Sequence, residues 1–431
     1  MSYYNKTNDN FNDTSGLLEG GWDQHFNIGK KLREQLIESD KFLQPDYTQS
    51  EIFITSTSAS RAILSAQAFL SGLYPDQAPP FKWLKIPPGS KSQGYNINAL
   101  PQQVNYLTRL NEQNCPRYQS ALQDVVQSEA FKQARGYWYT TYNQELSQLV
   151  GRPNLTEAQF DATCEYLFYS QYTNIQLNFT PTAYHRAFCQ AYEDDWIYKA
   201  TYGVDEQYKL QSFQFLEQLN EFAQYLYGNQ TIDQMTNFQE YFKNKDGPMP
   251  KFISYFTHDE IIAGYLEGLG YHNPQGAYPA AALNFEFFIE QQEKKENFLN
   301  DGNKQVYKTQ LGSNVFVKGD PNDIKVRIYY KQDINSSVPI ILPGFNSEVL
   351  SITEFAAFVQ KRANLSGIST NIPTACSVEY QSSGKYYDPQ LSIKQLQQIY
   401  KDALHKNSSL NSYIGVMGSI FGSIMIAAQH F

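Results

Sequence analysis

The residues of this chain best suited to chemistry lie in two places far apart in the sequence. Arg61 opens a helical pattern after the short apolar run 51–55, and His258-Asp259 stands between the apolar run 252–257 and another helical pattern. A guanidinium can donate two parallel hydrogen bonds to a phosphoryl group and never loses its charge. A positioned carboxylic acid can give a proton to a leaving alkoxide. The two places predict an anion-binding group and a general acid.

Each of these residues also has an ordinary structural interpretation, and both interpretations stay open at this point. Arg61 alone is typical of a solvated helix residue, and Asp259 alone is typical of a helix cap. The turn from a strand into a helix favours the functional interpretation of His258-Asp259. Such a turn aims backbone N–H groups and the positive end of the helix dipole at an anion.

Alternating strand and helix patterns must position these residues. Strands are predicted over 51–55, 252–257, 281–289 and 326–331, and helices over 60–73, 259–269 and 353–362. The block 115–247 is almost entirely helical in pattern. This order predicts an α/β core with an inserted helical cap.

Charge and cysteine usage narrow the class of protein. The net charge of −9 and the pI of about 5.3 argue against nucleic acid as a partner. The cysteines are Cys115, Cys164, Cys189 and Cys376, without CxxC spacing or a neighbouring set of histidine ligands, so no metal or other cofactor is expected. Eight glycosylation sequons accompany them, at Asn5, Asn12, Asn154, Asn178, Asn229, Asn335, Asn364 and Asn407. Together these features favour two disulfides in an oxidising compartment over four buried thiols.

The C-terminal region carries a polar amphipathic helix pattern at 389–406 and then an uncharged stretch at 414–428. The stretch has 15 residues, whereas a membrane-spanning helix needs about 20. A short anchor, a lipid-anchor signal and a buried helix are all compatible with it. We favour membrane attachment through 413–428.

Three stretches resemble the histidine acid phosphatase family, in its prostatic and lysosomal branch. Thr55–Ala66 resembles R-S-T-D-x-x-R-T-x-x-S-A, with Thr55 and Ser58 in place of the family's arginine and aspartate. Ser254–Ile262 resembles Y-S-x-H-D-T-T, and Asn114-Cys-Pro-Arg-Tyr118 resembles N-C-P-R-F. Weaker similarity extends from Leu17 to about Val378.

The resemblance implies roles for single residues. Arg61 and His258 would bind phosphate, and Asp259 would be the general acid. Cys115 would be bridged to Cys376, which leaves Cys164 to pair with Cys189. His25 falls on a helix position without a catalytic role, and the remaining histidines are expected to be structural or on the surface: His185, His272, His405 and His430.

The resemblance also implies an α/β fold with a mixed central sheet, helices on both faces and a helical cap. Its domains would be 1–114 with 248–380 for the core, 115–247 for the cap, and 381–431 for a stalk and hydrophobic tail. The implied activity is metal-independent hydrolysis of phosphate monoesters through a phosphohistidine. The expected partner is a small phosphate monoester or a phosphoprotein. The protein itself is expected in the secretory pathway, either lysosomal or extracellular and membrane-anchored. A homodimer is left open.

The family nucleophile is missing from this chain. It is a histidine in R-H-G-x-R-x-P at the end of the first strand, and R-H-G occurs nowhere here. Residues 1–16 contain no histidine, no arginine, no apolar strand pattern and no signal peptide. One explanation is a truncated sequence, and the other is a catalytically inactive binding or surface protein. We favour truncation, and we expect a vacancy or a poorly fitting strand in the sheet beside 252–257.

Overall fold

The structure is a computed structural model, and it describes ten stretches of the chain. They are residues 16–75, 94–172, 177–228, 234–235, 249–273, 275–289, 323–332, 337–368, 371–406 and 423–429. Within these stretches, no helix is both long and apolar enough to cross a membrane.

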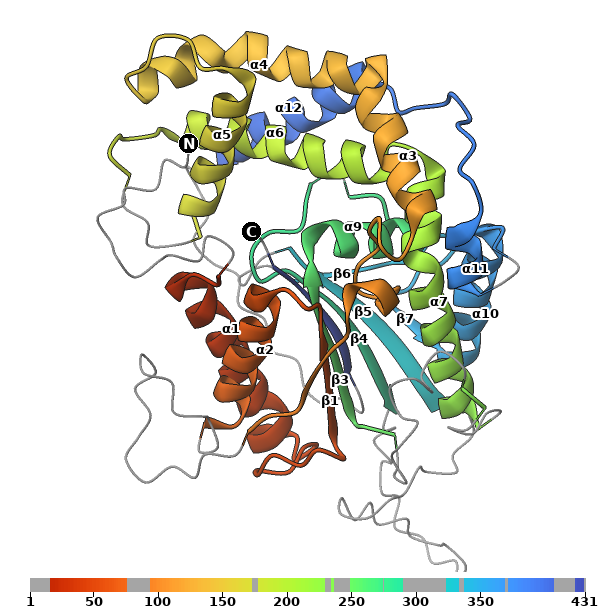
Figure 1. Ribbon diagram of the computed structural model, residues 1–431. Helices are drawn as coiled ribbons and strands as arrows, with labels where there is room; N and C mark the ends of the chain where they lie inside the picture. The colour runs from red at the N-terminus through yellow and green to blue at the C-terminus, as the bar shows by residue number, and fades with distance from the viewer. Residues whose placement is uncertain are drawn as a thin grey trace, which may run out of the picture.

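A mixed eight-stranded sheet forms the centre of the molecule (Figure 1). Its strands are β1 Ile52–Ser56, β2 Ile97–Ala99, β3 Phe252–His258, β4 Ala282–Ile289, β5 Ile324–Lys331, β6 Val338–Pro339, β7 Val349–Ser351 and β8 Ser423–Gln429. Their order is β2-β1-β3-β8-β4-β5-β6, and β7 also pairs with β5. Strands β2, β1, β3 and β8 run parallel, while the pairs from β8–β4 onward are antiparallel. The predicted fold class, α/β with a mixed central sheet, is confirmed.

Strand β3 shows why these residues form the middle of a sheet. All seven of its residues are buried, which is typical of a parallel strand covered on both faces. Phe252 and Phe256 point to one face, where their rings lie 5.9 and 5.6 Å from that of Phe69. Ile253 and Tyr255 point to the other face and join a second core.

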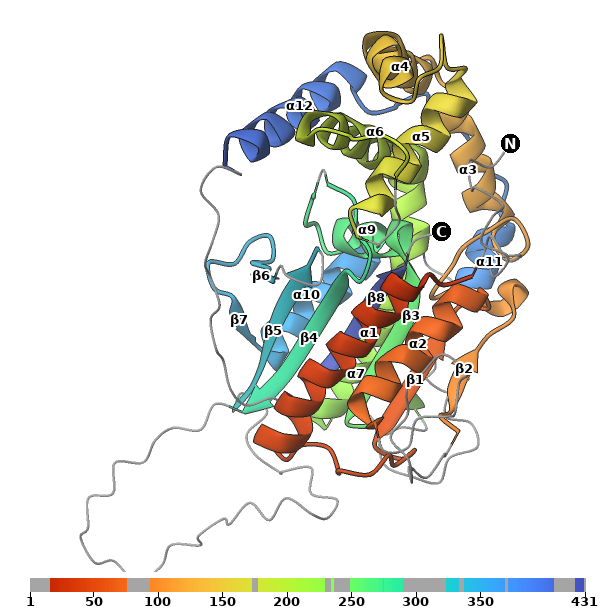
Figure 2. The same ribbon diagram turned by 90° about the vertical axis from the view of Figure 1, so that its left-hand side faces the viewer.

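Helices cover both faces of the sheet (Figure 2). On one face lie α1 Glu19–Leu32, the π-helix Arg33–Ser39 and α2 Ser60–Leu73; on the other lie α7 Asp205–Tyr227, α9 Asp259–Gly268 and α10 Ile352–Leu365. Helices α1 and α2 meet backbone to backbone at Gly29 and Gly72. A Cβ at either glycine would stand 2.0 Å from a carbonyl oxygen of the other helix, so only glycine allows this approach.

The cap lies over the end of the sheet where α9 begins (Figure 1). It is built from α3 Pro116–Gln127, α4 Glu129–Leu149, α5 Glu157–Ser170, α6 Ala183–Tyr202 and α12 Pro389–Lys406; the short helices η3 Gln102–Val104 and α11 Ile372–Ser377 lie outside it. Trp138, Phe160 and Tyr192 form its core together with Leu396 and Tyr400 of α12. Residues 381–431, expected as a stalk and tail, thus contribute α12 to the cap and β8 to the sheet.

The centre of the sheet contains no vacancy beside β3. Strand β8 pairs with β3 along seven residues and with β4 along five. The expectation of a vacancy is wrong, because a segment from the far end of the chain satisfies the backbone groups on both sides. Most of the uncharged stretch 414–428 precedes β8 and lies outside the described residues, while its last six residues, 423–428, belong to the strand.

Candidate active site

Arg61 and His258 meet at the carboxyl ends of two neighbouring parallel strands. Arg61 lies in the first turn of α2, which follows β1, and His258 ends β3. Strands β1 and β3 are paired in parallel, with Ser56 opposite Phe256, so the residues that follow them lie at the same edge. Nη2 of Arg61 is 3.5 Å from Nδ1 of His258, and the two side chains are 5% and 0% exposed.

A second arginine, Arg109, joins this pair and was not predicted from the sequence. Its Nη1 lies 3.1 Å from Nε2 of His258, and its Nη2 lies 3.9 Å from a carboxylate oxygen of Glu260. The only sequence signal is its position five residues before Asn114 of the N-C-P-R-Y stretch. The two guanidinium groups therefore approach the same imidazole, one from each ring nitrogen.

The loop that presents Arg109 is held by a dense set of hydrogen bonds. The side-chain amide of Asn114 donates to the carbonyl oxygens of Gln102, Asn105 and Arg109 at 2.8, 2.9 and 2.8 Å. The hydroxyl of Tyr265 in α9 and the amide of Gln211 in α7 both donate to the carbonyl of Leu107. A loop fixed by buried hydrogen bonds holds its arginine in place before any ligand arrives.

The local charge is positive and only partly compensated. Burial lowers the pKa of the Arg61 guanidinium, and the nearby charge of Arg109 lowers it further, whereas Glu260 and Asp259 raise it. An anion between the two guanidinium groups would offset the effect of Arg109 on Arg61. This arrangement can bind a dianion such as a phosphoryl group.

Asp259 and Glu260 form the acidic side of the site. His258 is the N-cap residue of α9, and its side chain makes no capping hydrogen bond. Asp259 is the first residue of the helix, so it does not hold the N-cap position that its structural interpretation assigned to it. Asp259 is buried, with 5% exposure. Burial raises the pKa of Glu260 well above its usual value, and the neighbouring Asp259 carboxyl raises it further.

Thr57, which follows β1, contacts the imidazole, and Thr257 of β3 contacts the loop that carries Arg109. Oγ1 of Thr57 lies 3.2 Å from Nε2 of His258, and the hydroxyl of Thr257 donates to the carbonyl of Thr108 at 2.5 Å. Thr55, one of the two departures from the resembling pattern, is buried within β1, while Ser58, the other, is exposed. Thr55 and Ser58 are uncharged, whereas the resembling pattern has an arginine and an aspartate at these positions.

Strand β8 ends beside this site. Its last residue, Gln429, pairs with His258 in the parallel register. His430 follows Gln429 in the sequence and lies outside the described residues. Among the other histidines, His25 is buried in α1 against Phe256, and burial lowers its pKa to about 3.

Both expected disulfides are present. Cys115 is bonded to Cys376 and Cys164 to Cys189, with Cα–Cα distances of 4.5 and 4.6 Å. The first bridge ties the start of α3, directly after Asn114, to α11. The second joins α5 to α6 inside the cap core.

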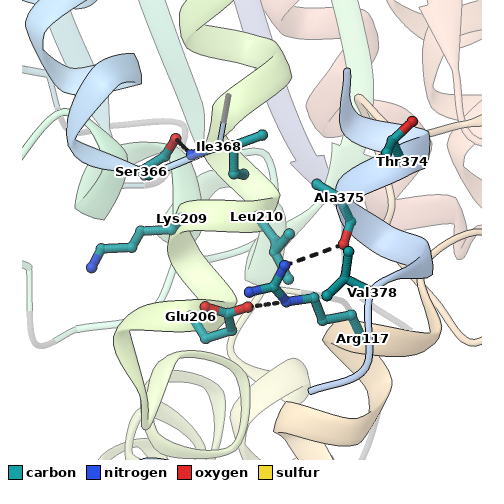
Figure 3. A pocket seen from close by; sticks show the side chains of 10 residues that line it. Arg117, Glu206, Lys209, Leu210, Ser366, Ile368, Thr374, Ala375 and Val378 are labelled. Atoms are coloured by element: carbon teal, nitrogen blue, oxygen red, sulfur yellow. Dashed lines mark hydrogen bonds and ion pairs between the residues drawn. The ribbon is translucent and has the colours of Figure 1, made fainter. Parts of the chain in front are cut away.

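A separate cavity of about 250 Å³ lies between α3, α7 and α11 (Figure 3). Arg117 crosses it, where it pairs with Glu206 and donates to the carbonyl of Ala375. Lys209 at its rim pairs with Asp205. None of Arg61, Arg109, His258 and Asp259 lines this cavity, and the charges of Arg117 and Lys209 are already compensated.

Fold and site together agree with a family assignment. The profile of the histidine phosphatase superfamily (branch 2) matches residues 11–300, more than half of the chain. The chain belongs to this family.

The chain is similar in sequence to acid phosphatases, and phytases are among the solved structures that resemble it. It is 24% identical to the lysosomal acid phosphatase of Xenopus laevis over 277 residues, which cover 64% of this chain and 58% of that protein. It is 30% identical to the human testicular acid phosphatase over 138 residues, or 31% of this chain and 29% of the relative. The solved phytase of Citrobacter braakii has a TM-score of 0.49 at 12% identity and covers 82% of this chain and 90% of its own. The Klebsiella sp. ASR1 phytase has a TM-score of 0.46 at 14% identity, with coverage of 83% and 88%.

Proposed function

We propose that this protein binds the phosphoryl group of a phosphate monoester between Arg61, Arg109 and His258, with Asp259 as the general acid for its hydrolysis. The observation that carries the proposal is the approach of both guanidinium groups to His258. The relatives named acid phosphatases favour hydrolysis at acidic pH. The geometry needs no metal for binding, because two arginines supply the charge of a phosphate dianion.

Hydrolysis would need a nucleophile, and the chain lacks the R-H-G motif. The covalent family route needs an imidazole at the end of the strand beside β3. In this chain that position in the sheet belongs to β8, which ends at Gln429.

The second candidate function is phosphate binding without turnover. The missing motif favours binding without turnover. Thr55 and Ser58 favour it as well, because they are uncharged where the family pattern has an arginine and an aspartate. A protein of this kind would bind a phosphorylated small molecule or a phosphoprotein and release it unchanged.

Hydrolysis of p-nitrophenyl phosphate between pH 4 and 7 separates the two candidates. For the enzyme, we expect turnover that Asp259→Asn abolishes without loss of anion binding. Binding without turnover would select the second candidate. An Arg61→Ala Arg109→Ala double variant that retains both anion binding and turnover would refute the proposed site itself.

We also propose that the protein passes through the secretory pathway and is glycosylated. The described sequon asparagines, Asn154, Asn178 and Asn364, are all exposed. The two disulfides fit an oxidising compartment. Homodimerisation is a further proposal, whereas membrane attachment through 413–428 would require residues 423–428 to leave the sheet. Mass spectrometry before and after glycosidase treatment tests glycosylation at the three exposed asparagines.

A further inference from the structure

A second cavity, of about 180 Å³, lies between α7, α9 and α10 and adjoins the cavity of Figure 3. Lys209 and Ser366 line both cavities, so these two residues stand where the cavities meet. In Figure 3 the ammonium group of Lys209 points away from Arg117. Its charge therefore lies on the side away from the Arg117–Glu206 ion pair.

The lining of the second cavity is positively charged. Of the described residues that line it, Lys209 and Arg362 are basic and none is acidic. Lys209 pairs with Asp205 at 3.2 Å, but the Asp205 side chain is 76% exposed, and a solvent-exposed ion pair of this kind contributes little. Two cations without an acid in one cavity contrast with the net charge of −9 of the chain, and they favour an anionic ligand.

Arg362 is held in a fixed position at this cavity. Its Nε donates to the carbonyl of Gly268 at 2.6 Å and its Nη2 to the carbonyl of Glu267 at 2.9 Å. Gly268 also lines the cavity, so the guanidinium group lies there, and not only the aliphatic part of the side chain. Among the described residues Arg362 forms no ion pair, and its Nη1 group makes no hydrogen bond. Nη1 can therefore donate to a ligand while both existing hydrogen bonds remain.

Two hydroxyl groups can add hydrogen bonds to an anion at Arg362. The hydroxyl of Ser366 accepts from the N–H of Ile368 at 3.0 Å, so its own hydrogen is available to a ligand. Burial raises the pKa of the Tyr208 hydroxyl, which therefore keeps its proton and can donate. The hydroxyl of Ser212 is already used, since it donates to the carbonyl of Tyr208 at 2.7 Å.

The rest of the two cavities offers apolar surface. Leu365 lines the second cavity and is 57% exposed, and Val378 lines the first and is 51% exposed. Leu210 and Ile368 also line the first cavity. Ligand sites typically combine apolar walls with a few polar groups that fix the orientation of the ligand. The ligand that fits these walls has an apolar part beside its anionic group.

The charge of the site suits one negative charge better than two. The carbonyl groups at the C-terminal end of α9 offset part of the charge of Arg362. Asp205 offsets part of the charge of Lys209. A carboxylate carries a single charge, and a guanidinium group is well suited to bind it.

We propose that the two cavities form one binding site for a monocarboxylate with a short apolar chain. The carboxylate lies between Arg362 and Lys209, and the chain extends past Ser366 toward Ile368 and Val378. None of the residues of the candidate active site lines either cavity. The inference therefore does not depend on the proposed function.

Hexanoate and 1-hexanol test this site, because they have the same carbon chain and differ in charge. The probes are titrated into the complete chain labelled with ¹³C at the methyl groups of isoleucine, leucine and valine. The signals of Ile368 and Val378 report binding at this site alone. Hexanoate should shift both signals, and 1-hexanol should bind about tenfold more weakly or less, since it lacks the charged hydrogen bonds. Equal affinities for the two probes, or no shift with hexanoate, would overturn the inference.

Arg362→Gln and Lys361→Gln remove the same charge from adjacent positions of α10, where Lys361 is exposed. Arg362→Gln should weaken hexanoate binding about 10- to 100-fold, because hydrogen bonds to a charged group are lost. Lys361→Gln should bind hexanoate as the unsubstituted protein does. Arg362→Lys keeps the charge and should restore part of the affinity. Equal affinities of the two glutamine variants would contradict the site.

One measurement needs no variant and decides the question if Arg362→Gln does not fold. In the unsubstituted protein, the terminal methyl group of bound hexanoate should give nuclear Overhauser effects to the methyl groups of Ile368 or Val378. Effects only to methyl groups outside the two cavities would place the ligand elsewhere and refute the inference.

Discussion

Nη1 of Arg109 lies 3.1 Å from Nε2 of His258, although 149 residues separate the two in the sequence. Two anchors hold the arginine there. The amide of Asn114 ties its loop together, and the Cys115–Cys376 bridge fixes the residue that follows Asn114. The N-C-P-R-Y stretch, which carries no chemistry itself, therefore positions an arginine of the proposed anion site.

Arg109→Ala should weaken sulfate or phosphate binding about 10- to 100-fold, since hydrogen bonds to charged groups contribute about 1.5–3 kcal/mol. Arg117→Ala is the matched control, because Arg117 lines the separate cavity of Figure 3. Its affinity for the anion should equal that of the unsubstituted protein. Calorimetry at one salt concentration measures both. If Arg117→Ala loses affinity for the anion and Arg109→Ala does not, the anion binds in the cavity of Figure 3.

Removal of the two disulfides should lower the free energy of unfolding by different amounts. The Cys115–Cys376 bridge spans 261 residues and the Cys164–Cys189 bridge spans 25. Loop-closure entropy predicts a stabilisation of about 5.6 kcal/mol for the first bridge and about 3.5 kcal/mol for the second. Serine pairs at each bridge, compared by urea denaturation, test this order.

The same serine pairs separate stability from binding. Only the Cys115→Ser Cys376→Ser protein should also lose anion affinity, because only that bridge adjoins the loop of Arg109. Equal affinities in the two folded variants would show that the loop holds Arg109 without the bridge.

Strand β8 should be essential to the sheet. Ala427 pairs with Phe256 of β3 and with Ala282 of β4. Ala427→Pro removes a ladder hydrogen bond from a central strand. It should lower the free energy of unfolding by about 1–3 kcal/mol, since a buried carbonyl loses its donor. Ala427→Gly keeps the N–H and should cost no more than about 1 kcal/mol. Equal urea midpoints for Ala427→Pro and the unsubstituted protein would exclude residues 423–429 from the folded sheet.

His25 should make stability depend on pH. Its pKa falls from 6.5 to about 3 on folding because burial disfavours the charged ring. Between these values the unfolded chain binds a proton that the folded protein does not. The contribution of neutral His25 is therefore complete above pH 6.5 and is lost as the pH falls toward 3, by about 1.4 kcal/mol per pH unit at most.

Urea denaturation of His25→Gln at several pH values measures this dependence. The variant should show a shallower decline in stability between pH 6 and 4 than the unsubstituted protein. His272→Gln is the control, since Glu267 raises the pKa of this histidine and its loss cannot flatten the decline. Parallel curves for the His25→Gln variant and the unsubstituted protein would contradict a buried neutral His25.

Local patterns were sufficient to predict the elements that carry Arg61 and His258. Strand β3 and the helices α2, α9 and α12 begin and end within one or two residues of the predicted ranges. Runs of apolar residues and helical periodicity depend on neighbours in the sequence, so such elements can be predicted without the fold. The family motifs added the α/β fold class, and both disulfides that they implied are present.

Tertiary structure alone decided what completes the site and the sheet. Arg109 belongs to no helix or strand, and its place depends on hydrogen bonds from Asn114 to residues in the same irregular loop. The uncharged stretch 414–428 has the composition of an anchor, yet its end becomes β8 because β3 and β4 present unpaired backbone groups on either side. The composition of a segment shows only that it is apolar. Which segment pairs with β3 and β4 depends on the free-energy cost of leaving their N–H and C=O groups unpaired.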